Sequence, residues 1–320
     1  MTVRAFYRAA SIEGAQPPHN TLTLKVYYPA LDRQGRNPNE MVPADAAQAP
    51  LPVAIFLPGF HCHLEAYQWL LVRLVERGFV GIAYHWLAPA GLTPGIDAAR
   101  WMPDAYGTAP TALALPTLLD ELERLQADSI LAGLLDLQTV VLGGHSAGGR
   151  LALENATPQF FPQVRAAFAY AAYTGVPTAF GYAPATVLPV SGAVLILMLN
   201  GTQDGIIARA SSQYGLAEPD PLAMARRTFW HGIQYGNGDK YWGLLDGGNH
   251  FVLTDPADAT LGTLSLDWPA TQSPQRLRDA AGRAIGAFLD AHLRARAGSP
   301  AALQQALDAS QAPIAALEQR

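Results

Sequence analysis

The chain has 320 residues, of which 50% are hydrophobic and 15% are charged, and its formal net charge is -5 at pH 7. A chain of this length and composition is able to bury a large core, as one domain or as two smaller ones, which excludes disorder for most of it. The acidic and basic residues are mixed and form no basic stripe, so nucleic acid is excluded as an expected partner.

Cysteine usage and apolar runs narrow the class of protein further. Cys62 is the single cysteine, so the chain cannot form an intramolecular disulfide. The first 14 residues lack the apolar region of a secretory signal, and the longest apolar run, Ala193–Leu199, is far shorter than the ~20 residues of a membrane helix. We therefore expect a cytoplasmic protein with no transmembrane segment, while the sequence leaves its oligomeric state open.

Apolar runs alternate with helical patterns along the chain, which predicts a largely parallel sheet covered by helices on both faces. The first expected strand, Thr21–Ala30, alternates with a period of two, as an antiparallel strand does. Buried strands are expected at residues 51–58 and 79–86, and between them apolar residues recur at helical spacing from Leu64 to Val75. This order of strand, helix and strand predicts a βαβ unit.

The later elements continue the same alternation. An amphipathic helix is expected at residues 115–125, and a final helix is expected from Pro274 to about Leu293, with Ser273 as its N-cap. Strands are expected at residues 139–144, 164–172, 192–200 and 240–246. The tail from Ser299 is compatible with one more short helix or with a frayed end.

The stretch Leu137–Ala156 runs from β-branched residues through glycines into a helix-forming segment, and Ser146 lies at the junction. Residues 144–148 read GHSAG, which matches the pattern GxSxG, with a predicted strand directly before it and a helix directly after it. Small residues on both sides permit a sharp turn that presents the serine hydroxyl at the edge of the sheet. His145 is expected to point away from Ser146 and to have a packing role.

A serine hydroxyl is a good nucleophile only when a base takes its proton, and the base must be oriented by a third group. Asp204 follows the most hydrophobic predicted strand through a short turn, and His250 follows a predicted strand and two glycines. Both should reach the edge where the loops of a parallel sheet converge, and the order Ser, Asp, His is typical of such an elbow. Asp220 and Asp246 are the alternative acids.

Acyl transfer also needs backbone N–H groups that stabilise the negative charge of the tetrahedral intermediate. Ala147 supplies one such donor at the start of the helix, where the helix dipole favours negative charge. The second donor is expected in the loop PGFHCH, where Gly59 allows the backbone to turn. We assign it to the amide of Phe60.

With these motifs the chain resembles the α/β-hydrolase superfamily. The segments that carry the resemblance are VAIFLPGF, LVERGFVGIAY, GGHSAGG, LNGTQDG and GGNHF, between about Thr21 and Leu293. The resemblance implies an α/β-hydrolase fold, the triad Ser146, Asp204 and His250, and an oxyanion hole formed by Phe60 and Ala147. It also implies one domain over residues 1–320, in which insertions at about 86–111, 172–190 and 206–239 line or cover the active site.

Within that superfamily the chain is similar to platelet-activating-factor acetylhydrolases, chlorophyllases, dienelactone-hydrolase-like proteins and bacterial polyester hydrolases. Dienelactone hydrolases proper have a cysteine nucleophile, whereas this elbow holds Ser146. Plant chlorophyllases have arginine in place of Ala147 and histidine in place of Pro58. The turn PGF is more similar to that of polyester hydrolases, which commonly carry disulfides that a single cysteine cannot form. The branch therefore stays open.

Several other residues have both a functional and a structural interpretation. We expect His61, Trp86, Trp101 and Tyr173 to line an apolar substrate pocket, although aromatic residues in such segments also cover cores. The triplet HCH at residues 61–63 resembles part of a metal site. However, zinc sites need three or four protein ligands and no second cluster lies nearby in sequence, so we expect neither a metal ion nor a cofactor.

The sequence thus predicts a serine hydrolase acting on a small-molecule or lipid-like carboxylic ester with an apolar acyl or alcohol group, by way of an acyl-enzyme. Release of phytol from chlorophyll and hydrolysis of a polyester are the alternative reactions. An alternative of another class is a binding protein that has the hydrolase fold and no turnover.

Overall fold

The computed structural model describes residues 2–31, 41–87, 95–234, 236, 239–294, 299–308, 310 and 313–320. Parts of the predicted insertions, residues 88–94, 235, 237 and 238, lie outside these ranges. None of the helices in the described ranges is long and apolar enough to span a bilayer.

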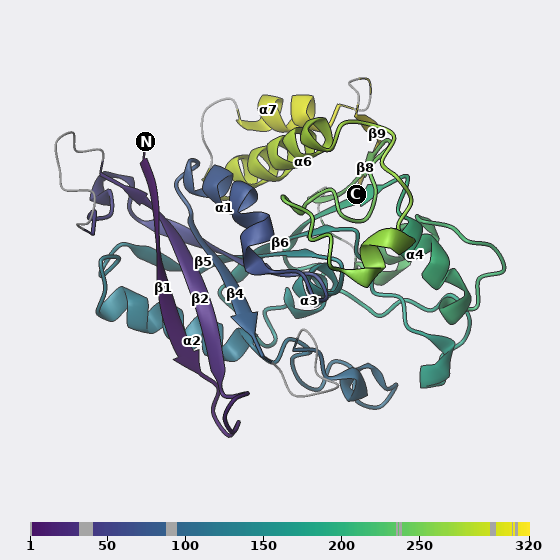
Figure 1. The fold of residues 1–320 in the computed structure, drawn as a ribbon, viewed down its shortest axis with the longest axis horizontal. Coiled ribbons are helices and arrows are strands. Elements are labelled where there is room, and N and C mark those ends of the chain that lie inside the picture. Colours follow the sequence, from purple (N-terminus) through teal and green to yellow (C-terminus); the bar gives the residue numbers. More distant parts are fainter. Residues whose placement is uncertain are drawn as a thin grey trace.

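One sheet runs through the described part of the chain (Figure 1). Its strands lie in the order β1-β2-β4-β3-β5-β6-β7-β8-β9. Strands β3 to β8 run parallel to one another, whereas β2 pairs antiparallel with β1 and β4, and β9 pairs antiparallel with β8. The strands are β1 (Thr2–Ser11), β2 (Thr21–Ala30), β3 (Leu51–Leu57), β4 (Val80–Trp86), β5 (Leu135–His145), β6 (Val164–Tyr170), β7 (Leu195–Gly201), β8 (Lys240–Leu245) and β9 (Ile314–Gln319).

Helices cover both faces of this sheet, and alternate residues of each central strand contact opposite layers. In β3, Val53 and Ile55 pack with α2 and α3, whereas Ala54 and Phe56 pack with α1 and α6. Figure 1 shows α1, α6 and α7 together on one side of the strands. The α-helices are α1 (Gln68–Val75), α2 (Leu115–Ala127), α3 (Ala147–Asn155), α4 (Gly205–Ala210), α5 (Ala223–Arg227), α6 (Pro274–Leu289) and α7 (Ser299–Ala306).

The structure confirms the predicted strands and the largely parallel sheet, and it adds two edge strands that the sequence did not indicate. β1 is half-exposed and carries Arg4 and Arg8, so it lacks a strong apolar alternation. β9 reads IAALEQ, which is rich in helix-forming residues, yet it pairs with β8. The last predicted helix ends its α-helical part at Leu289, and a π-helical turn continues to Arg294.

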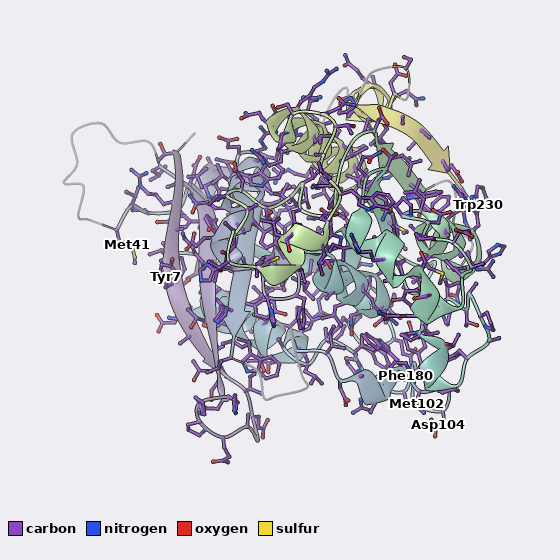
Figure 2. The ribbon with its side chains drawn as sticks, turned by 45° about the vertical axis from the view of Figure 1, so that its right-hand side comes forward. Tyr7, Met41, Met102, Asp104, Phe180 and Trp230 are labelled. Atoms are coloured by element: carbon purple, nitrogen blue, oxygen red, sulfur yellow. The ribbon has the colours of Figure 1, made fainter. Side chains whose placement is uncertain are left out.

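Large exposed hydrophobic side chains are spread over separate places on the surface. Tyr7 and Met41 lie on the side of β1, and Trp230 lies on the opposite side (Figure 2). Met102 is exposed at one corner, beside the half-buried Phe180, where two of the predicted insertions meet (Figure 2). Trp101 and Phe180 make an edge-to-face contact there, with ring centroids 6.2 Å apart.

Candidate active site

Ser146 occupies a strained turn between β5 and α3. Its φ and ψ are 54° and -122°, a region that residues with a side chain rarely adopt. The Ser146 N–H donates to the carbonyl of Tyr170 on the neighbouring strand over 2.9 Å. The turn is therefore anchored in the sheet, and it projects the hydroxyl from the carboxyl end of β5.

The two glycines of the GxSxG pattern allow backbone segments to approach closely at this turn. A Cβ atom added to Gly148 would lie 2.0 Å from the carbonyl oxygen of Leu57 at the end of β3. A Cβ atom added to Gly144 would lie 2.3 Å from the carbonyl oxygen of Gly148. Both neighbours are main-chain atoms and cannot rotate away, so any larger residue would force the strand, the turn and the helix apart.

Ser146, His250 and Asp204 form one chain of hydrogen bonds. His250 Nε2 lies 2.9 Å from Ser146 Oγ, and His250 Nδ1 lies 2.8 Å from Asp204 Oδ2. Asp204 is fully buried, and its Oδ1 accepts from the N–H of Ile207 over 2.8 Å. The three residues follow β5, β7 and β8, whose carboxyl ends meet at one edge because these strands are parallel. The structure thus brings together the three residues that the sequence singled out.

Burial and neighbouring charges change the pKa of His250 in opposite directions. Burial, the largest single influence, lowers the pKa of the imidazole. The charge and hydrogen bond of Asp204 and the charge of Asp267 oppose it, and together they raise the pKa of His250 above its usual value. The ring is therefore an effective proton acceptor from Ser146 and is stabilised once it carries the proton.

The amides of Phe60 and Ala147 lie on the two turns that flank the serine. Within the described residues, neither N–H donates to a protein acceptor. Phe60 is 45% exposed and stacks on His61, with ring centroids 3.9 Å apart. Two unpaired N–H groups on turns beside a serine hydroxyl have the chemistry to bind a negatively charged oxygen.

Comparisons with known proteins agree with this architecture. No protein-family model and no curated protein sequence matches the chain. Among solved structures, it is similar to a ferulic acid esterase from Streptomyces cinnamoneus, with a TM-score of 0.55 and 19% sequence identity over 92% of this chain and 90% of that chain. The chain has an α/β-hydrolase fold.

His145 joins two loops of this α/β-hydrolase fold beneath the serine. The Gly59 N–H donates to the hydroxyl of Tyr67 over 3.1 Å, and that hydroxyl donates to His145 Nδ1 over 2.8 Å. His145 Nε2 in turn donates to the carbonyl of His250 over 2.8 Å. Burial and the neighbouring His250 lower the pKa of His145 well below its usual value, so the ring stays neutral. A neutral ring with one donor and one acceptor satisfies both partners.

A second carboxylate, that of Asp267, lies behind the pair Asp204 and His250. No sequence pattern indicates Asp267, because it lies in a loop between two helical segments and belongs to no motif. The alternative acids do not replace Asp204 beside His250: Asp220 accepts from the N–H groups of residues 222 and 223 in a local turn, and Asp246 is exposed and accepts from Thr202 and Gln272. Neither contacts His250.

Two cavities of the fold lie beside the loop that contains Gly59 and His63. The first, which we call the histidine cavity, measures about 420 Å³ and is lined by residues that include Gly59, His61, His85 and Trp86. The second, the alanine cavity, also measures about 420 Å³ and is lined mainly by small apolar residues. The two cavities share Cys62, His63 and Asp258 as lining residues. Each has the size of a small-molecule site.

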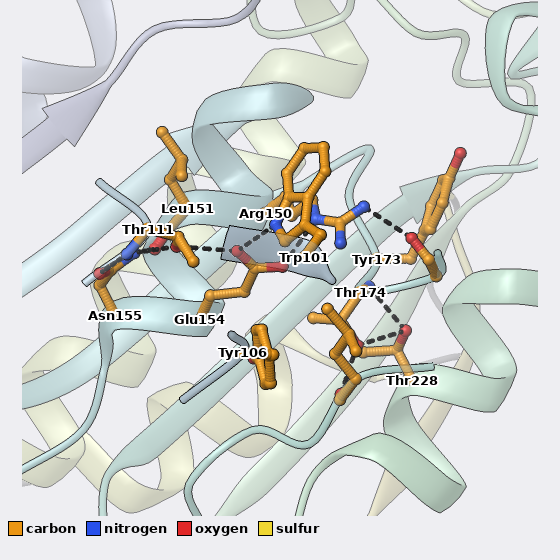
Figure 3. A network of polar contacts seen from close by, with 12 residues as sticks. Trp101, Tyr106, Thr111, Arg150, Leu151, Glu154, Asn155, Tyr173, Thr174 and Thr228 are labelled. Carbon is orange, nitrogen blue, oxygen red and sulfur yellow. Dashed lines mark hydrogen bonds and ion pairs between the residues drawn. The ribbon is translucent and has the colours of Figure 1, made fainter. Parts of the chain in front are cut away.

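Of the four predicted pocket residues, His61 and Trp86 line the histidine cavity, whereas Trp101 and Tyr173 line neither cavity. Trp101 covers the guanidinium of Arg150 at 3.8 Å and donates to Glu154 over 3.1 Å (Figure 3). Tyr173 donates to the hydroxyl of Tyr214 over 2.9 Å. Trp101 therefore attaches the segment 95–111 to α3, a role that its position in the sequence did not reveal.

The HCH triplet serves local structure in this fold. His61 stacks on Phe60, and His63 accepts from the N–H of Glu65 over 3.4 Å at the start of a short 3-10 helix. Cys62 is buried between the two cavities. Among the described residues, no three His, Cys, Asp or Glu side chains are grouped so that they could hold a metal ion.

Proposed function

We propose that this protein is a serine hydrolase of carboxylic esters, esterase-like or lipase-like, with Ser146 as nucleophile, His250 as base and Asp204 as the acid that orients it. The observation that carries this proposal is the hydrogen-bonded chain of 2.9 Å and 2.8 Å that starts at a serine on a strained elbow. A serine that only capped a helix would need neither the strained backbone nor the two partners.

In the proposed reaction, His250 takes the hydroxyl proton as Ser146 Oγ attacks the carbonyl carbon of the ester. The amides of Phe60 and Ala147 stabilise the oxyanion, and Asp204 stabilises the imidazolium. His250 then returns its proton to the leaving alcohol, and an acyl-enzyme remains. Water attacks the acyl-enzyme with the same base and releases the acid.

The cavities support an ester with an apolar acyl or alcohol group. The histidine cavity begins at Gly59, next to the proposed oxyanion donor, and Trp86 forms part of its wall. The alanine cavity adjoins it and offers Ala66, Ala257 and Leu261 as apolar lining. An apolar chain that leaves the reacting carbonyl through the first cavity would reach the second. The ferulic acid esterase of similar fold agrees with ester chemistry on this scaffold.

The proposal is tested by hydrolysis of p-nitrophenyl esters from acetate to palmitate. We expect turnover by the wild type, none by Ser146→Ala, and unchanged rates for Ser212→Ala, which removes an exposed serine from outside the site. Full activity of Ser146→Ala would refute the proposal.

A fluorophosphonate probe separates the enzyme from the alternative of a binding protein without turnover. Stoichiometric labelling of the wild type and of Ser212→Ala, with none of Ser146→Ala, is expected for an activated serine. An unlabelled wild type that also hydrolyses none of the esters would favour the binding protein.

A further inference from the structure

Asp267 forms hydrogen bonds with the main chain at His250 and directly after Asp204. It follows the short 3-10 helix Gly262–Leu266 and is half-buried. Its Oδ2 accepts from the N–H of His250 over 2.8 Å, and its Oδ1 accepts from the N–H of Gly205 over 2.8 Å. Gly205 directly follows Asp204, so a single carboxylate links the loop after β7 to the loop after β8.

The chain around Asp267 is closely fitted to these loops. A Cβ atom on Gly205 would lie 2.4 Å from the main-chain nitrogen of Trp268, so only glycine permits this approach. Asp267 Oδ1 also accepts from the N–H of Trp268 over 2.9 Å, and the carbonyl of Trp268 accepts from Asn249 Nδ2 over 3.0 Å. These contacts fix the carboxylate on both sides.

The charged and titratable groups around His250 come from several elements. Asp204 and Asp267 are the acids, His145 is the neighbouring ring beneath it, and Ser146 is its hydroxyl partner. Burial, together with the negative charges of Asp204 and Asp267, raises the pKa of the Tyr170 phenol well above its usual value, so that it stays neutral. Within the described residues, no lysine or arginine forms an ion pair with Asp267. The negative charge of Asp267 is therefore not neutralised by an ion pair, and the guanidinium of Arg209 bonds the carbonyl of the preceding residue, Leu266, over 2.8 Å.

We propose that Asp267 is a positioning residue, which holds His250 and Asp204 in register and adds a second negative charge that favours the imidazolium form of His250. This inference rests on the proposed function. Two hydrogen bonds to the main chain of different loops set the geometry, and the charge sets the basicity of the imidazole. Asp267 touches no reacting atom.

Asp267→Asn tests both parts of this role. An amide keeps the size but has only one oxygen, so it cannot accept from the N–H groups of both His250 and Gly205. We expect kcat to fall about tenfold with KM nearly unchanged. Loss of one negative charge should also move the acidic limb of the pH profile to lower pH. A variant that was merely damaged in its fold would lose activity, but this loss would not shift the acidic side of its pH profile to lower pH.

Asp246→Asn is the matched control, because it removes an exposed carboxylate from the same loop as His250 without a contact to the triad. It should leave kcat and the pH profile unchanged. A readout independent of turnover is the NMR titration of His250 in the Ser146→Ala background, assigned with His250→Gln. Its midpoint should fall when Asp267→Asn is added.

These measurements separate the inference from the proposed function. If the wild type neither turns over esters nor binds the fluorophosphonate, the proposed function fails, whereas the titration still tests the charge of Asp267. If Asp267→Asn has the same kcat as the wild type, and its activity falls at the same acidic pH, the inference is overturned. If Asp267→Asn does not fold, Asp267→Ser replaces it. If neither variant folds, Asp267 serves folding and the inference is overturned.

Discussion

The strain at Ser146 leads to a prediction about stability that is separate from activity. Ser146→Ala and Ser146→Gly both remove the hydroxyl and its hydrogen bond to His250, so the two variants differ mainly in the backbone. A non-glycine residue at φ 54° and ψ -122° costs about 1–3 kcal/mol. Glycine avoids this cost but loses about 0.4–1 kcal/mol through the greater freedom of the unfolded chain. Ser146→Gly should therefore be more stable than Ser146→Ala by about 1 kcal/mol.

Thermal and urea unfolding of the two variants measure this difference. With an unfolding entropy of about 2.1 cal/mol/K per residue, ~1 kcal/mol corresponds to roughly 1.5 °C in a chain of this size. Ala210→Gly is the control, since Ala210 has an ordinary helical φ of -74° and glycine there should destabilise the protein. If Ser146→Gly were no more stable than Ser146→Ala while the control behaved as expected, the argument from strain would be wrong.

Two further predictions concern catalysis. Burial lowers the pKa of His250, but its acidic neighbours outweigh burial and raise that pKa above its usual value. Because the base must be unprotonated, kcat/KM should fall as the pH drops through a midpoint above the usual histidine pKa. A midpoint below the usual histidine pKa would contradict the assignment of the base. Ala259→Trp should fill the alanine cavity and slow hydrolysis of long-chain p-nitrophenyl esters about tenfold without affecting acetate. Ala132→Trp, on the exposed surface, is the control, and equal losses on all esters would exclude the cavity as a binding site.

The fold was predictable where periodicity and burial agree. Central strands such as Leu51–Leu57 and Leu195–Gly201 are almost continuously apolar because both faces of the sheet are covered. The edge strands could not be predicted in this way, because local sequence patterns do not determine them. Residues 314–319 have good helix-forming propensity, and only pairing with β8 places them in the sheet, which no local pattern reveals.

The candidate site likewise contains residues that could be predicted from the sequence and residues that could not. Ser146, Asp204 and His250 could be identified because each follows a recognisable strand, and the structure places them within hydrogen-bond distance of one another. Their catalytic roles remain predictions. Asp267 could not be identified, since its contacts are to the main chain and carry no sequence pattern. The true neighbours of Trp101 also depend on tertiary packing, because Arg150 and Glu154 come from a distant helix.

The bridge made by Tyr67 and His145 has a consequence for engineering. It connects the turn at Gly59 to the loop of His250 through buried, uncharged groups, so the proposed oxyanion donor and the proposed base belong to one rigid unit. Most walls of the two cavities come from other segments, at the end of β4 and in the loop after His250. Substitutions in those walls can therefore reshape the choice of ester while the distances that govern the chemistry stay fixed.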